Sequence, residues 1–269
     1  MICFPNAKIN LGLNVTEKRS DGYHNIESVF LPVNLCDILE FVPSGDGKDY
    51  FNQSGIKLDI DPGTNLIIKA VRILREKHDI PGLNIHLHKA IPAGSGLGGG
   101  SSDAAFMLKM LNQEFNLGLS LDALKDLVSQ IGSDCPFFIE NKPCYITGRG
   151  EKIEFIDYPF SKAYIQIAHP GIHVSTSEAY SDICPKMPVK NLRSVLKSPP
   201  KKWQEELKND FEKPVFSKHP EIGNLRQEFI SHGAFYTAMS GSGSAVYGLF
   251  HEKPKQKIRY QVYEGEIIA

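Results

Sequence analysis

A cluster of glycines interrupts the middle of the chain and is followed at once by helix-forming residues. From Ile91 to Ala105 the sequence reads IPAGSGLGGGSSDAA. Glycine destabilises the interior of a regular element, so such a cluster is typical of a backbone that another group must approach closely. Amides at the start of a helix, where the helix dipole adds partial positive charge, bind phosphate groups. The stretch therefore predicts a phosphate site, and the alternative is a loop that is rich in glycine only for packing.

The expected donors of this site are the amides of Gly98 to Gly100 and the hydroxyls of Ser101 and Ser102. The full candidate segment comprises Pro92, Ala93, Gly94, Ser95, Gly96, Leu97, Gly98, Gly99, Gly100, Ser101 and Ser102. A P-loop would need a lysine after the glycines, and none follows here. The stretch matches G-x-G-x-x-G, but a dinucleotide site also needs a second parallel strand soon afterwards, and the pattern predicts another helix instead. The H-R-D and D-F-G motifs of protein kinases are missing from the sequence.

The elements that must position this segment can be read from the periodicity on either side of it. Alternation of apolar and polar residues over 83–88 predicts a strand that leads into the glycines. An apolar stripe over 104–115 predicts the helix that follows, and Ser120 is expected to cap a second helix. Asn65 is expected to cap an earlier helix. The predicted order is therefore strand, glycine-rich segment and helix start.

The pattern changes beyond about residue 155. The Pro/Lys-rich stretch 183–203 is expected to be mobile, and apolar runs on both sides of SGSGS predict a hairpin over 234–250. The mixture of helices and strands, together with this change, predicts an α+β or α/β protein of two parts, which we divide into residues 1–155 and 156–269.

Composition excludes several classes of protein. The 269 residues are 41% hydrophobic, which is enough for a substantial core. Thirty basic and 31 acidic residues nearly balance, which argues against a broad nucleic-acid surface. The five cysteines form no C-x-x-C pair, and no apolar leader or membrane span is evident. We expect a soluble, cytoplasmic protein with free thiols and without nucleic-acid or membrane partners.

Three separated motifs resemble those of the GHMP small-molecule kinases. These are PNAKINLGLNV near the N-terminus, PAGSGLGGGSSDAA in the middle and AMSGSGSAVYGLF near the C-terminus, in the order that the family shows. The resemblance implies an α+β, two-domain GHMP kinase fold. Residues 1–155 would form an ATP-binding domain of the ribosomal protein S5 domain 2-like type, and 156–269 a ferredoxin-like substrate domain. It also implies ATP as co-substrate together with Mg²⁺, whose protein ligands the sequence does not identify.

A finer resemblance concerns the acceptor of the phosphoryl group. The stretches SDGYHNIE, IGSDCPFF, HPGIHVSTSEAY and NDFE are similar to those of GHMP kinases that act in non-mevalonate isoprenoid synthesis. Those members phosphorylate the 2-hydroxyl of cytidine diphosphate methylerythritol, and the resemblance implies the same small-molecule substrate here. The alternatives are a GHMP-type kinase for another small alcohol and a non-catalytic nucleotide-binding protein on the same fold. The sequence leaves the oligomeric state open.

The resemblance assigns roles in the chemistry to three residues. Asp134 would be the catalytic carboxylate that accepts the hydroxyl proton, although an Asp after Gly-Ser and before a strand-like apolar run is otherwise typical of a turn. Lys8 would be its catalytic partner, although a lysine in a strand otherwise extends into water. Asn10 shares the face of Lys8 on a strand and is expected to contact the substrate.

The cytidine base of such a substrate needs a flat apolar platform and polar partners. Tyr23 and His24 could supply both, and Tyr180 falls where the family places a second aromatic ring across the base. Taken singly, each ring is more often a packing residue. Ser240 and Ser242 of the third motif are expected near substrate or phosphate.

Overall fold

The computed structural model describes residues 1–57 and 62–268 and divides the chain into two compact units that are interleaved in sequence. The first unit comprises Met1–Ala7, Leu35–Ala93 and Gly98–Lys142, and the second comprises Lys8–Asn34, Gly94–Leu97 and Pro143–Ala269. Both units contain helices and strands, which confirms the predicted α+β class. The functional division at residue 155 stays a prediction.

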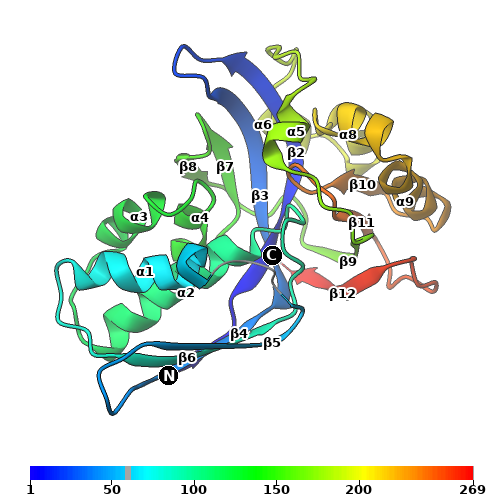
Figure 1. Ribbon diagram of the computed structural model, residues 1–269. Helices are drawn as coiled ribbons and strands as arrows, with labels where there is room; N and C mark the ends of the chain where they lie inside the picture. Colours follow the sequence, from blue (N-terminus) through cyan, green and yellow to red (C-terminus); the bar gives the residue numbers. More distant parts are fainter. Residues whose placement is uncertain (58–61, 269) are drawn as a thin grey trace. The chain divides into compact units, whose positions relative to one another are not determined.

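The described residues of the first unit form one sheet and four α-helices (Figure 1). Its strands are β1 (Ile2–Cys3), β4 (Ile38–Pro43), β5 (Tyr50–Gly55) and β6 (Leu83–Lys89), in the order β1-β4-β6-β5. Strand β6 runs antiparallel to β4 and parallel to β5. The helices are α1 (Leu66–Arg75), α2 (Gly99–Glu114), α3 (Leu121–Ser129) and α4 (Cys135–Glu140), and a 3-10 turn spans Pro62–Thr64. Helices α1 and α2 lie side by side.

The local signals predicted from the sequence act as expected in this unit. The Asn65 side chain accepts a hydrogen bond from the Ile67 amide (2.8 Å), and Ser120 accepts one from the Ala123 amide (3.2 Å). Each satisfies an amide that has no partner within its own helix, so both predicted caps are confirmed. The strand predicted before the glycines is β6, and the helix predicted after them is α2.

The apolar run after Asp134 is a helix, so the expectation of a strand-like run there is wrong. Residues 135–140 form α4, with a proline in its first turn, where the missing amide costs nothing. All of its residues except Glu140 are buried. A short run that is buried on every side carries no periodicity, so the sequence pattern alone cannot separate helix from strand.

The second unit is built on two sheets. One has the order β2-β3-β7-β8, from β2 (Asn6–Lys18), β3 (His24–Cys36), β7 (Cys144–Thr147) and β8 (Lys152–Phe155). The other has the order β10-β11-β9-β12, from β9 (Lys162–Ala168), β10 (Tyr236–Met239), β11 (Val246–Phe250) and β12 (Gln261–Ile268). Strands β10 and β11 pair antiparallel, which confirms the predicted hairpin. Its helices are α5 (Thr176–Tyr180), α6 (Leu192–Leu196), α7 (Trp203–Glu206), α8 (Glu212–Lys218) and α9 (Pro220–Ser231).

Close packing joins α9 to the second of these sheets. A Cβ atom added to Gly248 of β11 would lie 2.5 Å from the Phe229 ring, so glycine at this position lets the helix lie directly against the strand. The cluster around Phe229 also includes Leu13 and Val15 of β2. The core of the second unit therefore contains side chains from both ends of the chain.

The Pro/Lys-rich stretch contains regular structure, and its expected mobility stays a prediction. Residues 191–203 contain α6 and a 3-10 turn and lead into α7. The Asn191 side chain accepts a hydrogen bond from the Ser194 amide (2.8 Å), and the buried Trp203 indole donates to the Ser198 carbonyl (3.1 Å). The helix cap at Asn191 and the buried Trp203 ring stabilise regular structure here despite the proline and lysine residues of the stretch.

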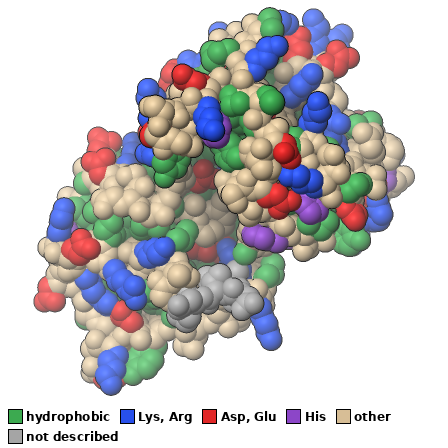
Figure 2. All heavy atoms as spheres, turned by 45° about the horizontal axis from the view of Figure 1, so that its top comes forward, with side chains coloured by type: hydrophobic (Ala, Val, Ile, Leu, Met, Phe, Trp, Pro, Cys, Tyr) green, Lys and Arg blue, Asp and Glu red, His purple; other side chains and the backbone are tan. Residues whose placement is uncertain are grey.

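Charged side chains of both signs are interspersed on the face that Figure 2 presents. This distribution agrees with the near balance of 30 basic and 31 acidic residues. In the part of the chain that the structure describes, every helix is too short or too polar to cross a lipid bilayer.

Candidate functional site

The three sequence motifs meet in the second unit. The Lys8 amide at the start of β2 donates a hydrogen bond to the Leu97 carbonyl (2.9 Å), so the first motif is bound to the glycine-rich segment. The Ser240 hydroxyl, in the turn between β10 and β11, donates to the Gly96 carbonyl (2.9 Å). Residues far apart in sequence thus surround Gly94–Leu97.

Two features hold the third motif against this segment. Gly96 has a φ of +77°, and a Cβ atom there would lie 1.9 Å from the Ser240 carbonyl oxygen. Only glycine allows both the left-handed backbone and this approach, so at this position packing explains the glycine. The Asn209 side-chain amide donates to the carbonyls of Met239 and Gly241, each at 2.8 Å, and fixes the turn from its other side.

Lys8 and Asn10 are buried polar residues of β2. The Lys8 side chain is buried, lies 4.5 Å from the centre of the Phe30 ring and donates to Asn10 Oδ1 (2.7 Å). Asn10 Nδ2 donates to Ser28 Oγ (2.9 Å), and this hydroxyl donates to the Gly12 carbonyl (2.7 Å). The expectation that Lys8 and Asn10 share a face is confirmed, and the alternative of a lysine extended into water is wrong. The network fixes the orientation of the Asn10 amide.

The start of α2 in the first unit has the features of an anion site. Gly98 precedes the helix with a φ of +75° and accepts a hydrogen bond from the Ser102 amide (2.9 Å). Gly100 is exposed, and among the described residues a Cβ atom there would contact only Leu66 Cδ1, at 3.6 Å, so none of these residues covers its outer face. Ser102 Oγ is buried and has no hydrogen-bond partner among the described residues. Open backbone, helix-start amides and a buried hydroxyl fit a phosphate group that approaches from outside.

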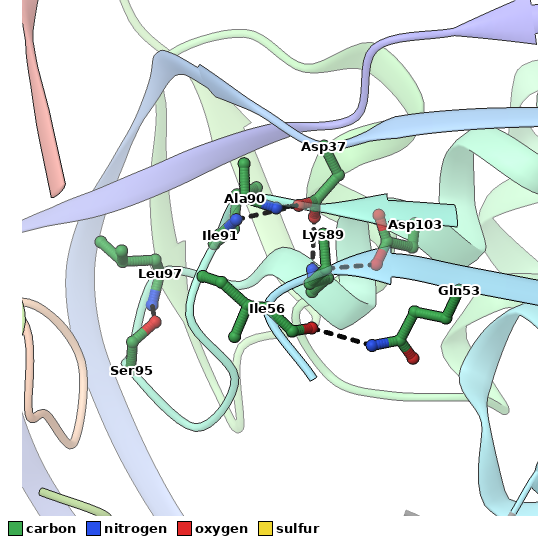
Figure 3. A network of polar contacts seen from close by, with 9 residues as sticks. All are labelled: Asp37, Gln53, Ile56, Lys89, Ala90, Ile91, Ser95, Leu97 and Asp103. Carbon is green, nitrogen blue, oxygen red and sulfur yellow. Dashed lines mark hydrogen bonds and ion pairs between the residues drawn. The ribbon is translucent and has the colours of Figure 1, made fainter. Parts of the chain in front are cut away.

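A buried network of charges lies at the base of the glycine-rich segment (Figure 3). One carboxylate oxygen of Asp37 accepts the amides of Ala90 (2.7 Å) and Ile91 (2.9 Å). Its other oxygen accepts a hydrogen bond from Lys89 Nζ, which also donates to Asp103 Oδ2 (3.1 Å). All three charged side chains are almost completely buried, which is rare unless such groups are paired.

The sequence analysis did not identify Lys89 or Asp37. The signal for Lys89 is its place in the alternation of β6. Side chains two residues apart share a face of a strand, so Lys89 lies on the same buried face as Leu83, Ile85 and Leu87. Gly99 adjoins this network, since a Cβ atom there would lie 2.8 Å from Lys89 Nζ. Burial, opposed by the Lys89 charge and reinforced by Asp37, raises the pKa of Asp103 to about 7.

Asp134 lies directly before α4, in the first unit. Its side chain makes no hydrogen bond that caps the helix, which argues against a purely structural capping role. The next residue, Cys135, connects it to the start of α2. Burial raises the pKa of the Cys135 thiol to about 12, against the opposing effect of the Ser101 hydroxyl beside it. Asp134 and the first turn of α2 are therefore neighbours within one unit, whereas Lys8 belongs to the other unit.

The three candidate base-binding rings lie in the second unit and divide into two groups. His24 stacks on Tyr180, with ring centres 4.7 Å apart and an angle of 22° between the planes. Tyr180 also meets the edge of Phe211 (4.7 Å). Tyr23 is 58% exposed and lies under the guanidinium of Arg149, at 4.8 Å. The structure thus pairs Tyr180 with His24, while Tyr23 presents a ring to solvent.

The described residues show no group of three or more His, Cys, Asp and Glu side chains that could hold a metal ion. Mg²⁺ in nucleotide sites is held largely by phosphate oxygens and water, with few protein ligands. The structure therefore assigns no protein ligand to such an ion. The first unit offers the helix-start amides of α2 and a carboxylate before α4, and the second unit offers a buried ammonium beside an oriented amide.

Comparison with known proteins gives two family matches and several relatives. The model described as "GHMP kinases N terminal domain" matches residues 65–142, and "GHMP kinases C terminal" matches residues 191–266. The 4-diphosphocytidyl-2-C-methyl-D-erythritol kinase of Parabacteroides distasonis is 50% identical over 254 residues, which cover 94% of this chain and 93% of the relative.

Two solved structures extend the comparison. A crystal structure of 4-(cytidine 5'-diphospho)-2C-methyl-D-erythritol kinase has a TM-score of 0.77 and 31% identity, and covers 94% of this chain and 91% of its own. The mevalonate kinase of Methanococcus jannaschii has a TM-score of 0.69 at 14% identity over 95% and 92% of the two chains, and this likeness concerns the fold alone.

Proposed function

The chain belongs to the GHMP kinase family, and from its relatives there we infer that it transfers the γ-phosphoryl group of ATP to the 2-hydroxyl of 4-diphosphocytidyl-2-C-methyl-D-erythritol. This reaction is a step of non-mevalonate isoprenoid synthesis. The observation that carries the proposal is the meeting of three separated motifs through Lys8, Gly96 and Ser240. A protein that only kept the fold would not need a buried lysine joined to an oriented asparagine at that point.

ATP would bind at the start of α2. The amides of Gly98 to Gly100, the hydroxyls of Ser101 and Ser102 and the helix dipole would hold its phosphates, and the open face of Gly100 would admit them. The remaining residues from Pro92 to Leu97 would complete this site. Mg²⁺, when bound, would neutralise phosphate charge and would be held mainly by the nucleotide and water.

The chemical step would depend on positioning and on a proton acceptor. Asp134 would accept the proton of the 2-hydroxyl as the new bond to phosphorus forms. The Lys8 ammonium would stabilise negative charge on the reacting oxygens and keep Asp134 ionised. Asn10, whose amide is oriented by Ser28, would contact the substrate. Tyr180, His24 and Tyr23 would contact the cytosine ring.

We place this reaction in the cytoplasm, without nucleic-acid or membrane partners. We assign ATP binding to residues 1–155 and a substrate-binding contribution to residues 156–269, which include Tyr180.

The proposed activity is tested by measuring ADP release from purified protein with a panel of alcohols. We expect turnover with 4-diphosphocytidyl-2-C-methyl-D-erythritol and none above background with mevalonate, homoserine or galactose. Turnover of another alcohol in preference would identify a different GHMP-type kinase. ATP binding without turnover of any alcohol would support a non-catalytic protein.

Replacement of Asp134 by Asn keeps its size but removes the charge and the proton acceptor. We expect kcat to fall by about 10²- to 10⁴-fold, with little change in KM for either substrate, because a general base acts mainly in the transition state. Lys8→Met should also lower kcat, and the double variant should be scarcely slower than Asp134→Asn if the two act as one unit. Steady-state kinetics on folded protein measure both. Near-normal kcat in Asp134→Asn would remove this residue from the mechanism.

Gly100→Ala separates stability from nucleotide binding. The added methyl group has room, and alanine stabilises a helix by up to about 1 kcal/mol relative to glycine, so unfolding should require more denaturant. On the open face, the same methyl group should raise the Kd for a non-hydrolysable ATP analogue by about tenfold or more, equivalent to about 1.4 kcal/mol.

The control for Gly100→Ala is Gly45→Ala, because an added Cβ at Gly45 meets no described atom within 4 Å, and Gly45 lies far from α2 in the sequence. Its Kd for the analogue should equal that of the unchanged protein. Equal Kd values for Gly100→Ala and Gly45→Ala would contradict phosphate binding at this face.

Tyr23→Leu keeps an apolar side chain but removes the aromatic ring. Because the ring is 58% exposed, the melting temperature should hardly change. Loss of stacking, which contributes about 0.5–1.5 kcal/mol, should raise KM for the cytidine substrate by about 2- to 10-fold and leave KM for ATP unchanged. Tyr23→Phe, which keeps the ring, should behave like the unchanged protein. If Tyr23→Leu is silent, Tyr23 does not contact the base.

A further inference from the structure

We propose that Asp37 and Lys89 are positioning residues that hold the two ends of the glycine-rich segment together before any nucleotide binds. The segment in question is 92–102, and the buried network of Figure 3 lies where it begins and where it ends. The proposal rests on the proposed function only in that the ligand of this segment is taken to be ATP.

Asp37 fixes the beginning of the segment. It comes directly before β4, and its own amide donates to the Pro5 carbonyl (2.9 Å), so its backbone is anchored to the segment between β1 and β2. A single oxygen of its carboxylate accepts the two consecutive amides of Ala90 and Ile91. Hydrogen bonds to an ionised acceptor are stronger than neutral ones, so the chain is held firmly at the point where β6 ends.

Lys89 extends this hold to the end of the segment. Its ammonium bonds to Asp37 and reaches Asp103 in α2 at 3.1 Å. The position of Gly99 is consistent with this contact, because any side chain there would meet the ammonium at 2.8 Å. The last strand residue before the glycines is thereby bonded to the helix that follows them.

The charges of Asp37, Lys89 and Asp103 explain why the three residues should contribute unequally to the order of the glycine-rich segment. Two carboxylates and one ammonium, all buried, carry one excess negative charge unless a carboxyl holds a proton. Asp103 fits a protonated carboxyl, because its Oδ1 has no hydrogen-bond partner among the described residues and burial raises its pKa. The charges that face it are Lys89 and Asp37, and the nearby Cys3 thiol, whose pKa is raised to about 12, is neutral. The essential ion pair is therefore Asp37 with Lys89.

The functional consequence follows from the composition of the segment. Glycine has more backbone freedom than any other residue, so ordering this stretch costs more conformational entropy than usual. The apparent Kd of a ligand that needs the ordered segment equals its intrinsic Kd divided by the fraction of the protein in which the segment is already ordered. Binding therefore weakens as that fraction falls. Fixing both ends in the free protein reduces that cost, which is pre-organisation for ATP.

The experiment compares three variants, Asp37→Asn, Lys89→Met and Asp103→Asn. In Asp37→Asn an amide N–H₂ faces the Lys89 ammonium, donor against donor, whereas Asp103→Asn keeps an oxygen that can accept the hydrogen bond from Lys89 Nζ. Hydrogen exchange of peptides covering 89–105 reads the order of the segment, and calorimetry gives the Kd for a non-hydrolysable ATP analogue and for the cytidine substrate.

We expect faster exchange over 89–105 in Asp37→Asn and Lys89→Met. If the ordered form falls to about a tenth, the Kd for the ATP analogue rises about tenfold, and the Kd for the cytidine substrate stays the same. Asp103→Asn should stay within about threefold of the unchanged protein in every readout. The double variant Asp37→Asn/Lys89→Met removes both charges of the ion pair, so neither is left buried without its partner. It should therefore fold even if Lys89→Met alone does not. It should still bind the ATP analogue weakly.

Arg75→Met is the matched control, because Arg75 forms an ion pair with Asp49 and bonds to the Ile80 carbonyl near the other end of β6. It should lower stability without changing exchange over 89–105 or the Kd for the analogue. Unchanged exchange in folded Asp37→Asn, or equal loss of affinity for both ligands, would overturn the proposal. An unchanged protein that binds no ATP analogue would overturn the proposed function instead, and the exchange measurement would still decide the positioning role.

Discussion

The hydrogen bond from the Ser240 hydroxyl to the Gly96 carbonyl is the contact on which the arrangement of the second unit's site depends. It requires a residue without a side chain at 96 and a third-motif turn held still by Asn209. With that turn in place, the start of β2 lies against the same segment, and the Lys8–Asn10–Ser28 chain of hydrogen bonds is complete. Lys8, the proposed catalytic lysine, is therefore positioned by backbone packing between motifs that the sequence separates widely.

Much of the local structure could be predicted because the relevant signals are short-range. Asn65 and Ser120 cap helices through amides two or three residues away, and the alternation in β6 reports one buried face directly. The run after Asp134 could not be assigned in the same way, because burial on all sides removes the periodicity that distinguishes helix from strand.

The site was predictable only in part, for a similar reason. The motifs indicated Lys8, Asn10 and the glycines, but not that Gly96 serves packing while Gly100 presents an open face. The partners of a buried charge are fixed by tertiary structure, so nothing near Lys89 in the sequence points to Asp37. The position of Lys89 on the apolar face of β6 was the signal in the sequence that this lysine must be paired with an acidic group.

The interleaving of the two units has a consequence for synthesis on the ribosome. Residues 8–34 pack with side chains from the last third of the chain, for example Leu13 with Phe229 in one cluster. Translation from the N-terminus delivers β2 long before those partners exist, whereas residues 35–93 and 98–142 emerge together and carry most of the first unit. Contacts between such distant residues form slowly, and an exposed apolar strand is prone to aggregation meanwhile. The nascent chain must therefore keep the strand that carries Lys8 from pairing wrongly until translation is nearly complete.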